Sequence, residues 1–545
     1  MKKDIVYLMI VGLVAITCYA RFANNFFTGR DLPGLLLAVK DKPFQEVLSV
    51  PLLGGRNYYR PIASLSYAMD YQLFGLTPWG YHATNIFIHG MVVLSTYILV
   101  KAFLKSPALA LLAAIVVAVH PATAEVVPDI SYRMDLLGTL FSVLSVASFI
   151  WVFQLDREKA KTKFVVGLSL SVLSFLLGIL SKEIAFVTVF IVGLYAFVFV
   201  ERFDLKQRIL NSLIATLPYV VVMFPVLAVR QMVLGNPWGQ VFSGKSYDLV
   251  GRLKDGISYT VTYFWFLLFP QFPSPIDFES NQLIEFLRAN ASILAILMLW
   301  LLLVALNIWS SVRKEHAYWK MVFTARITRI LFFLVGWLIF ALFVFLATLF
   351  RFRYMYFAVV PLAILISMCC FSLLQKFIAL LHHYRNGLAV NKRDLSMNVM
   401  GTGLVLLILL QWLYLSALFK PYNAYNESGM LVSSLVKQME VFSENSKDGA
   451  RATVYVENLP IPRREINFAD PRPRELGNIW IPEYYRLFYG NSGIDWCVKS
   501  VARTEKYYVP YQIKTENGDF KLQFETSIMD KKTDFASCSE EFSFK

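Results

Sequence analysis

Charged residues stand at several points where long apolar runs begin or end. The stretch HPATAEVVPDISYRMD, residues 120–135, lies between two such runs and carries Glu125, Arg133 and Asp135. Ionisable side chains at a membrane boundary are costly unless they line a wet, protein-enclosed site, so they are functional candidates. The alternative is an ordinary polar loop, and the rest of the chain has to decide between the two.

Three other junctions carry similar residues. The first long loop holds Asp31 and Arg60, SKE at 181–183 holds Lys182 and Glu183, and RFRYMY at 351–356 holds Arg351, Arg353 and Tyr354. Any one of these is more often a solvated or snorkelling loop end than part of a site. If all four junctions lie on one face of a membrane, that interpretation becomes much weaker.

Such a face could support group transfer from a lipid phosphate. Arginine and lysine hold phosphates, arginine in bidentate fashion, and fixed positive charge stabilises a phosphate leaving group. A carboxylate at the same level can act as general base on an acceptor hydroxyl. The side chains that could supply the positive charge are Arg60, Arg133, Lys182, Arg351 and Arg353.

Other chemistries find less support in the sequence. No GxxxxGK[ST] loop is present, which argues against ATP-driven work. No His or Cys spacing typical of a metal site occurs, and the need for a divalent metal stays open. The net charge of +14 is better explained by Lys and Arg in cytoplasmic loops than by binding of nucleic acid.

The elements that must position these residues are membrane spans. Of 545 residues, 57% are hydrophobic and 17% charged, which is the composition of a polytopic, mostly α-helical membrane protein. We expect about eleven transmembrane helices, which lie at 5–19, 83–103, 108–120, 136–154, 164–180, 184–200, 212–233, 292–311, 330–349, 355–375 and 398–418.

The charge of the loops predicts the orientation. Basic connections at 156–163, 201–208, 312–329 and 382–394 all fall in the cytoplasm when the spans alternate from a cytoplasmic N-terminus. The apolar segment 259–269 is then interfacial or re-entrant, because a crossing there would place the later basic loops outside. All four charged junctions, including Asp31 and Arg60, lie on the outer face in this arrangement.

Two further features lie on that outer face. Apolar pieces within the first outer loop, residues 21–81, predict helices on the membrane surface. A charged, strand-rich stretch predicts a small α/β extracytoplasmic domain over 419–545, after a membrane module over 1–418. Cys497 and Cys538 both fall in that domain, where a disulfide is allowed.

Two motifs carry a family resemblance. Residues 58–89, YYRPIASLSYAMDYQLFGLTPWGYHATNIFIH, and 120–137, HPATAEVVPDISYRMDLL, resemble the membrane module of the protein O-mannosyltransferases that combine transmembrane helices with tetratricopeptide repeats. More broadly the chain resembles the type C glycosyltransferases (GT-C fold), and the resemblance covers about residues 1–418. The matching residues are Tyr59, Arg60, Pro61, Tyr81, His82, Asn85, His89, His120, Pro121, Glu125, Ile130, Ser131, Arg133 and Asp135, followed by SKE at 181–183 and Arg353-Tyr354.

The resemblance implies an inverting transfer of a sugar from a polyprenyl-phosphate donor to a protein hydroxyl, a glycan or a lipid. It makes Asp31 the best candidate for the catalytic base, and Lys182 and Arg353 the candidates for binding the donor phosphate. The remaining candidates for the pocket are Arg60, Glu125, Arg133, Asp135, Glu183, Arg351 and Tyr354. We expect an integral protein of a bacterial inner membrane whose partners are lipids, donor and acceptor.

Three departures from the family keep other functions open. Arg30-Asp31 supplies one carboxylate where the family has an acidic pair, Asp129 replaces a Trp, and no tetratricopeptide repeats follow. A non-catalytic assembly protein therefore remains an alternative. A transporter or flippase of lipid-linked sugars is another, and it predicts charges at mid-membrane and interrupted helices in both halves of the chain.

Overall fold

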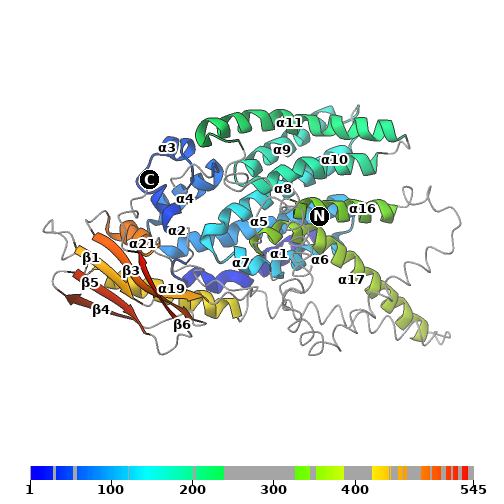
Figure 1. The fold of residues 1–545 in the computed structure, drawn as a ribbon. Helices are drawn as coiled ribbons and strands as arrows, with labels where there is room; N and C mark the ends of the chain where they lie inside the picture. The colour runs from blue at the N-terminus through cyan, green and yellow to red at the C-terminus, as the bar shows by residue number, and fades with distance from the viewer. Residues whose placement is uncertain are drawn as a thin grey trace, which may run out of the picture.

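The computed structural model is mostly helical, with a mixed β-sheet near the C-terminus (Figure 1). It describes residues 2–28, 32–52, 58–120, 122–156, 158–200, 204–237, 326–343, 352–385, 420–440, 442, 452–457, 459–462, 480–490, 494–504, 511–516, 519–525 and 531–537.

Apolar helices form the main body. They are α1 (Lys2–Tyr19), α5 (Pro78–Leu104), α6 (Pro107–Val119), α8 (Arg133–Phe153), α9 (Lys161–Ile179), α10 (Val187–Phe199), α11 (Leu205–Leu234), α16 (Arg326–Phe343) and α17 (Met355–Arg385). Among the described residues, 5 helices are long and apolar enough to cross a membrane, and three shorter apolar helices accompany them. The chain is therefore an integral membrane protein.

The predicted spans agree with these helices wherever both can be compared. Nine of the expected spans, from 5–19 to 355–375, coincide with the helices named above. The expected spans at 292–311 and 398–418, and the re-entrant segment at 259–269, lie outside the described residues. The count of eleven spans therefore stays a prediction.

Local sequence explains where α11 begins and ends. The side chain of Asp204 accepts a hydrogen bond from the backbone N–H of Lys206, which satisfies one free donor of the first turn. Gly235 ends the helix at φ 71°, a left-handed conformation that glycine adopts at little cost. Between them the apolar side chains of Leu213, Leu217 and Phe224 are exposed, as expected of a face that contacts lipid.

The first outer loop contains three short helices, α2 (Leu32–Leu37), α3 (Phe44–Ser49) and α4 (Pro61–Phe74). The apolar pieces that predict helices are FQEVLSVPLL (44–53) and IASLSYAMDYQLFGL (62–76), and α3 and α4 fall on them. Phe44 and Leu48 of α3 and Met69 and Leu73 of α4 are exposed. Such faces suit the membrane interface, and the location of these helices on a membrane surface stays a prediction.

The C-terminal sheet is built from β1 (Ala452–Glu457), β2 (Leu459–Pro462), β3 (Ile494–Thr504), β4 (Tyr511–Glu516), β5 (Asp519–Phe524) and β6 (Lys531–Ser537). Strand β1 runs parallel to β3 and β5, and β2 runs parallel to β3, whereas β4 and β6 are antiparallel edge partners of β5 and β3. The helices α19 (Lys420–Gln438) and α21 (Trp480–Tyr489) accompany it.

The sheet region is fastened to the first outer loop. Phe488 of α21 stacks on Phe26 with ring centroids 6.0 Å apart, and Lys40 Nζ donates a 2.9 Å hydrogen bond to the carbonyl of Leu487. A Cβ atom on Gly429 of α19 would lie 3.1 Å from the backbone nitrogen of Phe26, so only glycine allows this approach without a shift. Figure 1 shows α21 between the sheet and α2.

Cysteine pairing can be followed for one of the two predicted partners. Cys497 in β3 is disulfide-bonded, whereas Cys18, Cys369 and Cys370 are free. The predicted partner, Cys538, lies outside the described residues. Its pairing with Cys497 stays a prediction.

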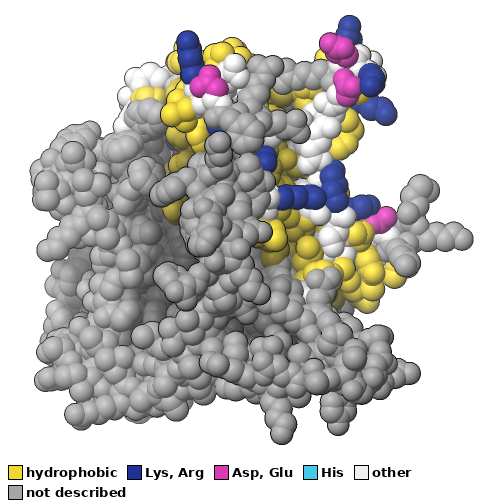
Figure 2. Space-filling model, turned by 90° about the vertical axis from the view of Figure 1, so that its right-hand side faces the viewer, with side chains coloured by type: hydrophobic (Ala, Val, Ile, Leu, Met, Phe, Trp, Pro, Cys, Tyr) yellow, Lys and Arg dark blue, Asp and Glu magenta, His cyan; other side chains and the backbone are white. Residues whose placement is uncertain are grey.

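The helix ends away from the sheet are rich in basic residues. Figure 2 views the molecule from that side and shows Lys and Arg side chains beside apolar ones. Exposed basic side chains on the helix ends and connections there are Lys105, Lys159, Lys161, Lys206 and Arg326. This distribution is typical of a cytoplasmic face.

Candidate active site

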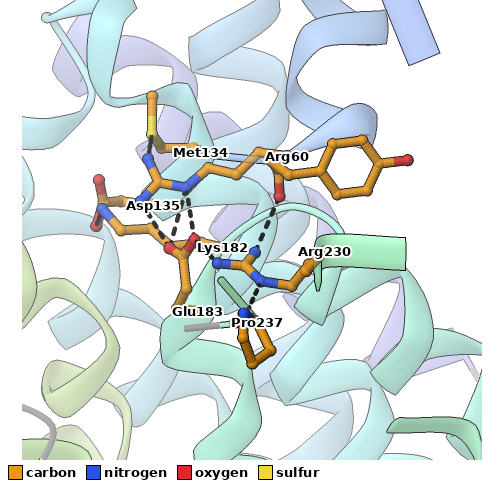
Figure 3. A network of polar contacts seen from close by, with 8 residues as sticks. Arg60, Met134, Asp135, Lys182, Glu183, Arg230 and Pro237 are labelled. Atoms are coloured by element: carbon orange, nitrogen blue, oxygen red, sulfur yellow. Dashed lines mark hydrogen bonds and ion pairs between the residues drawn. The ribbon is translucent and has the colours of Figure 1, made fainter. Parts of the chain in front are cut away.

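Five segments that are far apart in the sequence bring charged side chains together where helices begin or end, and Figure 3 shows the side chains from four of them. Arg60 precedes α4, Asp135 lies in the first turn of α8, and Lys182 and Glu183 lie where α9 is followed by the short helix η3 (Glu183–Phe186). Arg230 lies near the end of α11, and Arg353 lies in η6 (Phe352–Tyr354) before α17. We call these six residues the cation cluster.

Glu183 holds two arginines at once. Its Oε2 atom accepts hydrogen bonds from Arg60 Nη2 at 2.6 Å and Nε at 3.0 Å. Its Oε1 atom accepts one from Arg230 Nη2 at 3.1 Å and a longer one from Arg60 Nε at 3.3 Å. The remaining nitrogen of Arg60, Nη1, contacts the thioether sulfur of Met134, which is a weak acceptor. An anion that approached Arg60 would therefore compete with a poor partner.

Lys182 and Asp135 form the second ion pair of the cluster. Lys182 Nζ lies 2.5 Å from Asp135 Oδ1, and the Lys182 residue is only 5% exposed. Gly138 lets α8 approach, because a Cβ atom there would lie 3.0 Å from the Cβ of Lys182. Burial lowers the pKa of Lys182 to about 8, with Arg353 and Arg60 nearby lowering it further and Asp135 opposing them.

Aromatic rings support the remaining cation. The guanidinium carbon of Arg353 lies 4.4 Å from the ring centroid of Tyr132 and 5.3 Å from that of Tyr354, and Lys182 Nζ lies 5.0 Å from the same Tyr354 ring. Within the described part of the chain, two buried polar atoms here have no hydrogen-bond partner. They are Nε of Arg353 and Oδ2 of Asp135.

The cluster carries more positive than negative charge. Four cationic side chains face two carboxylates, which leaves a formal surplus of two positive charges. Helices α8 and α17 begin here, and helix N-termini add partial positive charge. Burial of unbalanced cations is costly unless an anion joins them. The arrangement is therefore suited to bind a phosphate.

A second buried cluster surrounds Arg133. Its guanidinium pairs with Asp70 at 2.6 Å and donates to Asn85 Oδ1 at 2.8 Å and to the carbonyls of Ser66 and Tyr81. All three of its nitrogens have partners and the residue is fully buried. This geometry favours a role in joining α4, α5 and α8 over contact with a substrate, and the predicted pocket role of Arg133 stays untested.

The structure brings most of the predicted site residues together. Arg60, Asp135, Lys182, Glu183, Arg353 and Tyr354 form or line the cation cluster. Glu125 lies in α7 (Thr123–Val126), where its carbonyl accepts a hydrogen bond from Tyr425 of α19. Asp31 and Arg351 lie outside the described residues. The residues that flank Asp31, Phe27 and Leu32, are buried.

Arg230 is the member of the cation cluster that the sequence did not indicate. It stands near the outer end of the apolar run 212–233, where a lone arginine resembles a snorkelling anchor. The signal that could have found it is its place on the same face as the other charged junctions. As for metals, no group of three or more His, Cys, Asp or Glu side chains within the described ranges could hold an ion, and Asp31 is not among them.

Comparisons with known proteins give one consistent group of curated relatives. No family model matches the chain. It is 35% identical over 96 residues to the Protein O-mannosyl-transferase tmtc2 of Xenopus laevis, covering 18% of this chain and 12% of that protein. It is 25% identical over 231 residues to human Protein O-mannosyl-transferase TMTC4, covering 37% of this chain and 31% of that protein. The chain thus spans at most about a third of these relatives.

Solved structures give weaker likenesses. The oligosaccharyltransferase of Archaeoglobus fulgidus, tethered with an acceptor peptide, matches with a TM-score of 0.45 at 11% identity, over 99% of this chain and 74% of that one. ArnT from Cupriavidus metallidurans, bound to undecaprenyl phosphate, matches with a TM-score of 0.40 at 12% identity, over 95% and 97%. The curated relatives confirm the predicted resemblance: the chain is similar to protein O-mannosyltransferases.

Proposed function

We propose that the chain is an integral-membrane glycosyltransferase that moves a sugar from a polyprenyl-phosphate donor to an acceptor hydroxyl. In this reaction the acceptor oxygen forms a bond to the anomeric carbon of the sugar, and the bond from that carbon to the phosphate oxygen breaks. The acceptor proton passes to a carboxylate base, and the polyprenyl phosphate leaves. The acceptor is a protein, a glycan or a lipid, as the resemblance implies.

The observation that carries this proposal is the charge surplus of the cation cluster. The donor phosphodiester has one negative charge, and the phosphate that leaves gains a second as the bond breaks. A preorganised site with two surplus positive charges stabilises the developing charge more than the donor itself. Lys182 and Arg353 are the proposed ligands of this phosphate, with Arg60 beside them.

Asp31 is the proposed base. It lies in the first outer loop, and the buried flanks Phe27 and Leu32 anchor the chain on both sides of it. Phe27 also contacts Tyr81, which accepts a hydrogen bond from Arg133 through its carbonyl. The loop therefore starts from a firmly packed region next to the motif residues.

The proposed location is a bacterial inner membrane, with the N-terminus in the cytoplasm and the cation cluster at the outer face. The basic helix ends remote from the sheet support this orientation. The C-terminal sheet then lies outside the cytoplasm, where the disulfide of Cys497 is stable.

The test uses the purified full chain in liposomes with a radiolabelled polyprenyl-phosphate mannose and an acceptor extract. Replacing Lys182 by Gln, with Asp135→Asn to avoid an unpaired carboxylate, should lower sugar transfer at least about 100-fold, because a charge-stabilising donor is lost. The matched control, Lys159→Gln, removes an exposed lysine between α8 and α9 and should transfer normally.

Three outcomes would contradict the proposal. Wild-type transfer by the doubly substituted protein would show that the cluster does not hold the donor phosphate. Movement of the labelled donor across the bilayer without transfer to any acceptor would identify a flippase. A correctly folded protein that binds donor and does neither would fit an assembly role.

A further inference from the structure

Arg230 is buried, whereas most of its helix, α11, is exposed. Only 11% of the apolar window of α11 is buried, and most of its side chains face outward. Arg230, near the end of this helix, is nevertheless 1% exposed and points into the cation cluster (Figure 3). A buried arginine on an otherwise loosely packed helix needs a specific reason, because burial of a guanidinium is costly.

All three nitrogens of Arg230 are already engaged. Nε donates to the carbonyl of Pro237 at 2.9 Å, Nη1 to the carbonyl of Tyr59 at 3.0 Å, and Nη2 to Glu183 Oε1 at 3.1 Å. These partners lie on three segments, and none is a substrate atom. Arg230 is therefore placed to hold other groups in position rather than to grip a phosphate itself.

The group that it holds most directly is Glu183. Arg230 occupies Oε1, and Arg60 makes its two shorter contacts, of 2.6 and 3.0 Å, with Oε2. One carboxylate is thus shared between two guanidinium groups, and neither arginine is fully neutralised. Arg60 also reaches Oε1, through a longer 3.3 Å hydrogen bond from its Nε. Without Arg230, both oxygens of Glu183 would be available to Arg60 alone and would offset more of its positive charge.

The second contact of Arg230 acts on the backbone. Tyr59, whose carbonyl accepts from Nη1, directly precedes Arg60. Arg230 therefore fixes both the main chain that carries Arg60 and the carboxylate that orients its side chain. Arg60 Nη1, which faces only the thioether of Met134 among its described contacts, is then left available for an anion.

We propose that Arg230 is a positioning residue that shares Glu183 with Arg60, so that the positive charge of Arg60 is only partly offset and its guanidinium is aimed at the donor phosphate. The inference deepens the proposed function and rests on it. It adds a residue of α11 to a site otherwise built from the first outer loop, α8, η3 and η6.

The test compares Arg230→Met with the double variant Glu183→Gln, Arg230→Met. The single variant should raise both the donor KM and the Kd for undecaprenyl phosphate about tenfold, which corresponds to about 1.4 kcal/mol. The acceptor KM should not change. In the double variant the lost carboxylate offsets the lost cation, so donor affinity should return to within about threefold of wild type.

Two controls make the result specific. Arg326→Met removes an exposed arginine at the start of α16 and should leave both constants unchanged. Arg230→Lys keeps the positive charge but loses the planar, forked guanidinium, so a smaller rise in donor KM is expected. This variant is used for the test if Arg230→Met does not fold.

The inference is overturned if folded Arg230→Met or Arg230→Lys binds undecaprenyl phosphate as wild type does. It is also overturned if Glu183→Gln fails to improve the single variant, or if acceptor and donor KM rise together. Failure of the proposed function looks different, because the wild-type protein would then neither transfer sugar nor bind undecaprenyl phosphate.

Discussion

Two residues in the first turn of α8, Arg133 and Asp135, belong to two different buried clusters. The clusters differ in how completely their charges are balanced. Arg133 pairs with Asp70 and has partners on all three nitrogens in a fully buried site. Asp135 belongs to the cation cluster, in which four cations face two carboxylates.

The difference teaches that burial and charge alone do not mark a functional residue. A satisfied buried ion pair is expected to maintain structure, since loss of either partner leaves an uncompensated charge. An unbalanced cluster is expected to act on a ligand, since only an anion completes it. The following experiments test whether the Arg133 cluster maintains the structure while the cation cluster binds the ligand.

The largest effect is expected from Arg133→Met. Removing the guanidinium leaves Asp70 buried without its partner, and burial already raises the pKa of Asp70. Unfolding of the detergent-solubilised protein should become easier by about 3–5 kcal/mol. Adding Asp70→Asn should recover part of this loss. The structural role of Arg133 is disproved if Arg133→Met unfolds as wild type does but no longer binds undecaprenyl phosphate.

An intermediate effect is expected from pH. Lys182 has a pKa of about 8, below its ordinary value, so it is charged at pH 7 and mostly neutral at pH 9. Affinity for undecaprenyl phosphate should therefore fall by up to about tenfold between these values. The second ionisation of a phosphate, near pKa ~6, is complete over this range. Lys182→Arg should flatten the profile, and an equally steep profile in that variant would exclude Lys182 as the titrating group.

The smallest effect is expected from Gly138→Ala. The added methyl would lie 3.0 Å from the Cβ of Lys182, so the lysine must shift away from Asp135. Crowding of this kind costs about 1 kcal/mol, and the donor KM should rise about fivefold. Gly12→Ala in α1 is the matched control, because no heavy atom lies within 4 Å of its added Cβ. Equal effects of the two substitutions would disprove the packing argument.

Much of the helical framework could be predicted because apolar length and loop charge are local properties. Lys182, Glu183 and Asp135 were also predictable as neighbours, since the positive-inside rule places their junctions on one face. The distinction between Arg133 and Lys182 was not. Whether a cation is balanced depends on partners such as Asp70, which lies 63 residues before Arg133 and has no sequence mark of its role.

Arg230 shows the same limit from the opposite direction. Its neighbours in the sequence are apolar except Gln231, and its partners Glu183 and Tyr59 lie far away along the chain. Only the packing of the outer end of α11 against η3 and the first outer loop reveals its role. The small C-terminal sheet was expected from alternating strands, but its fastening to that loop through Phe488 and Lys40 was not.

That fastening has a consequence for how the chain can be divided or recombined. The contact of Phe488 with Phe26, the hydrogen bond from Lys40 to Leu487 and the close approach at Gly429 join the C-terminal sheet region to the segments around Phe26 and Lys40. A cut after residue 418 would strip cover from Phe26 and Phe27. Grafting another C-terminal region onto this membrane module would require new residues on both sides of the contact between the sheet region and residues 26–40.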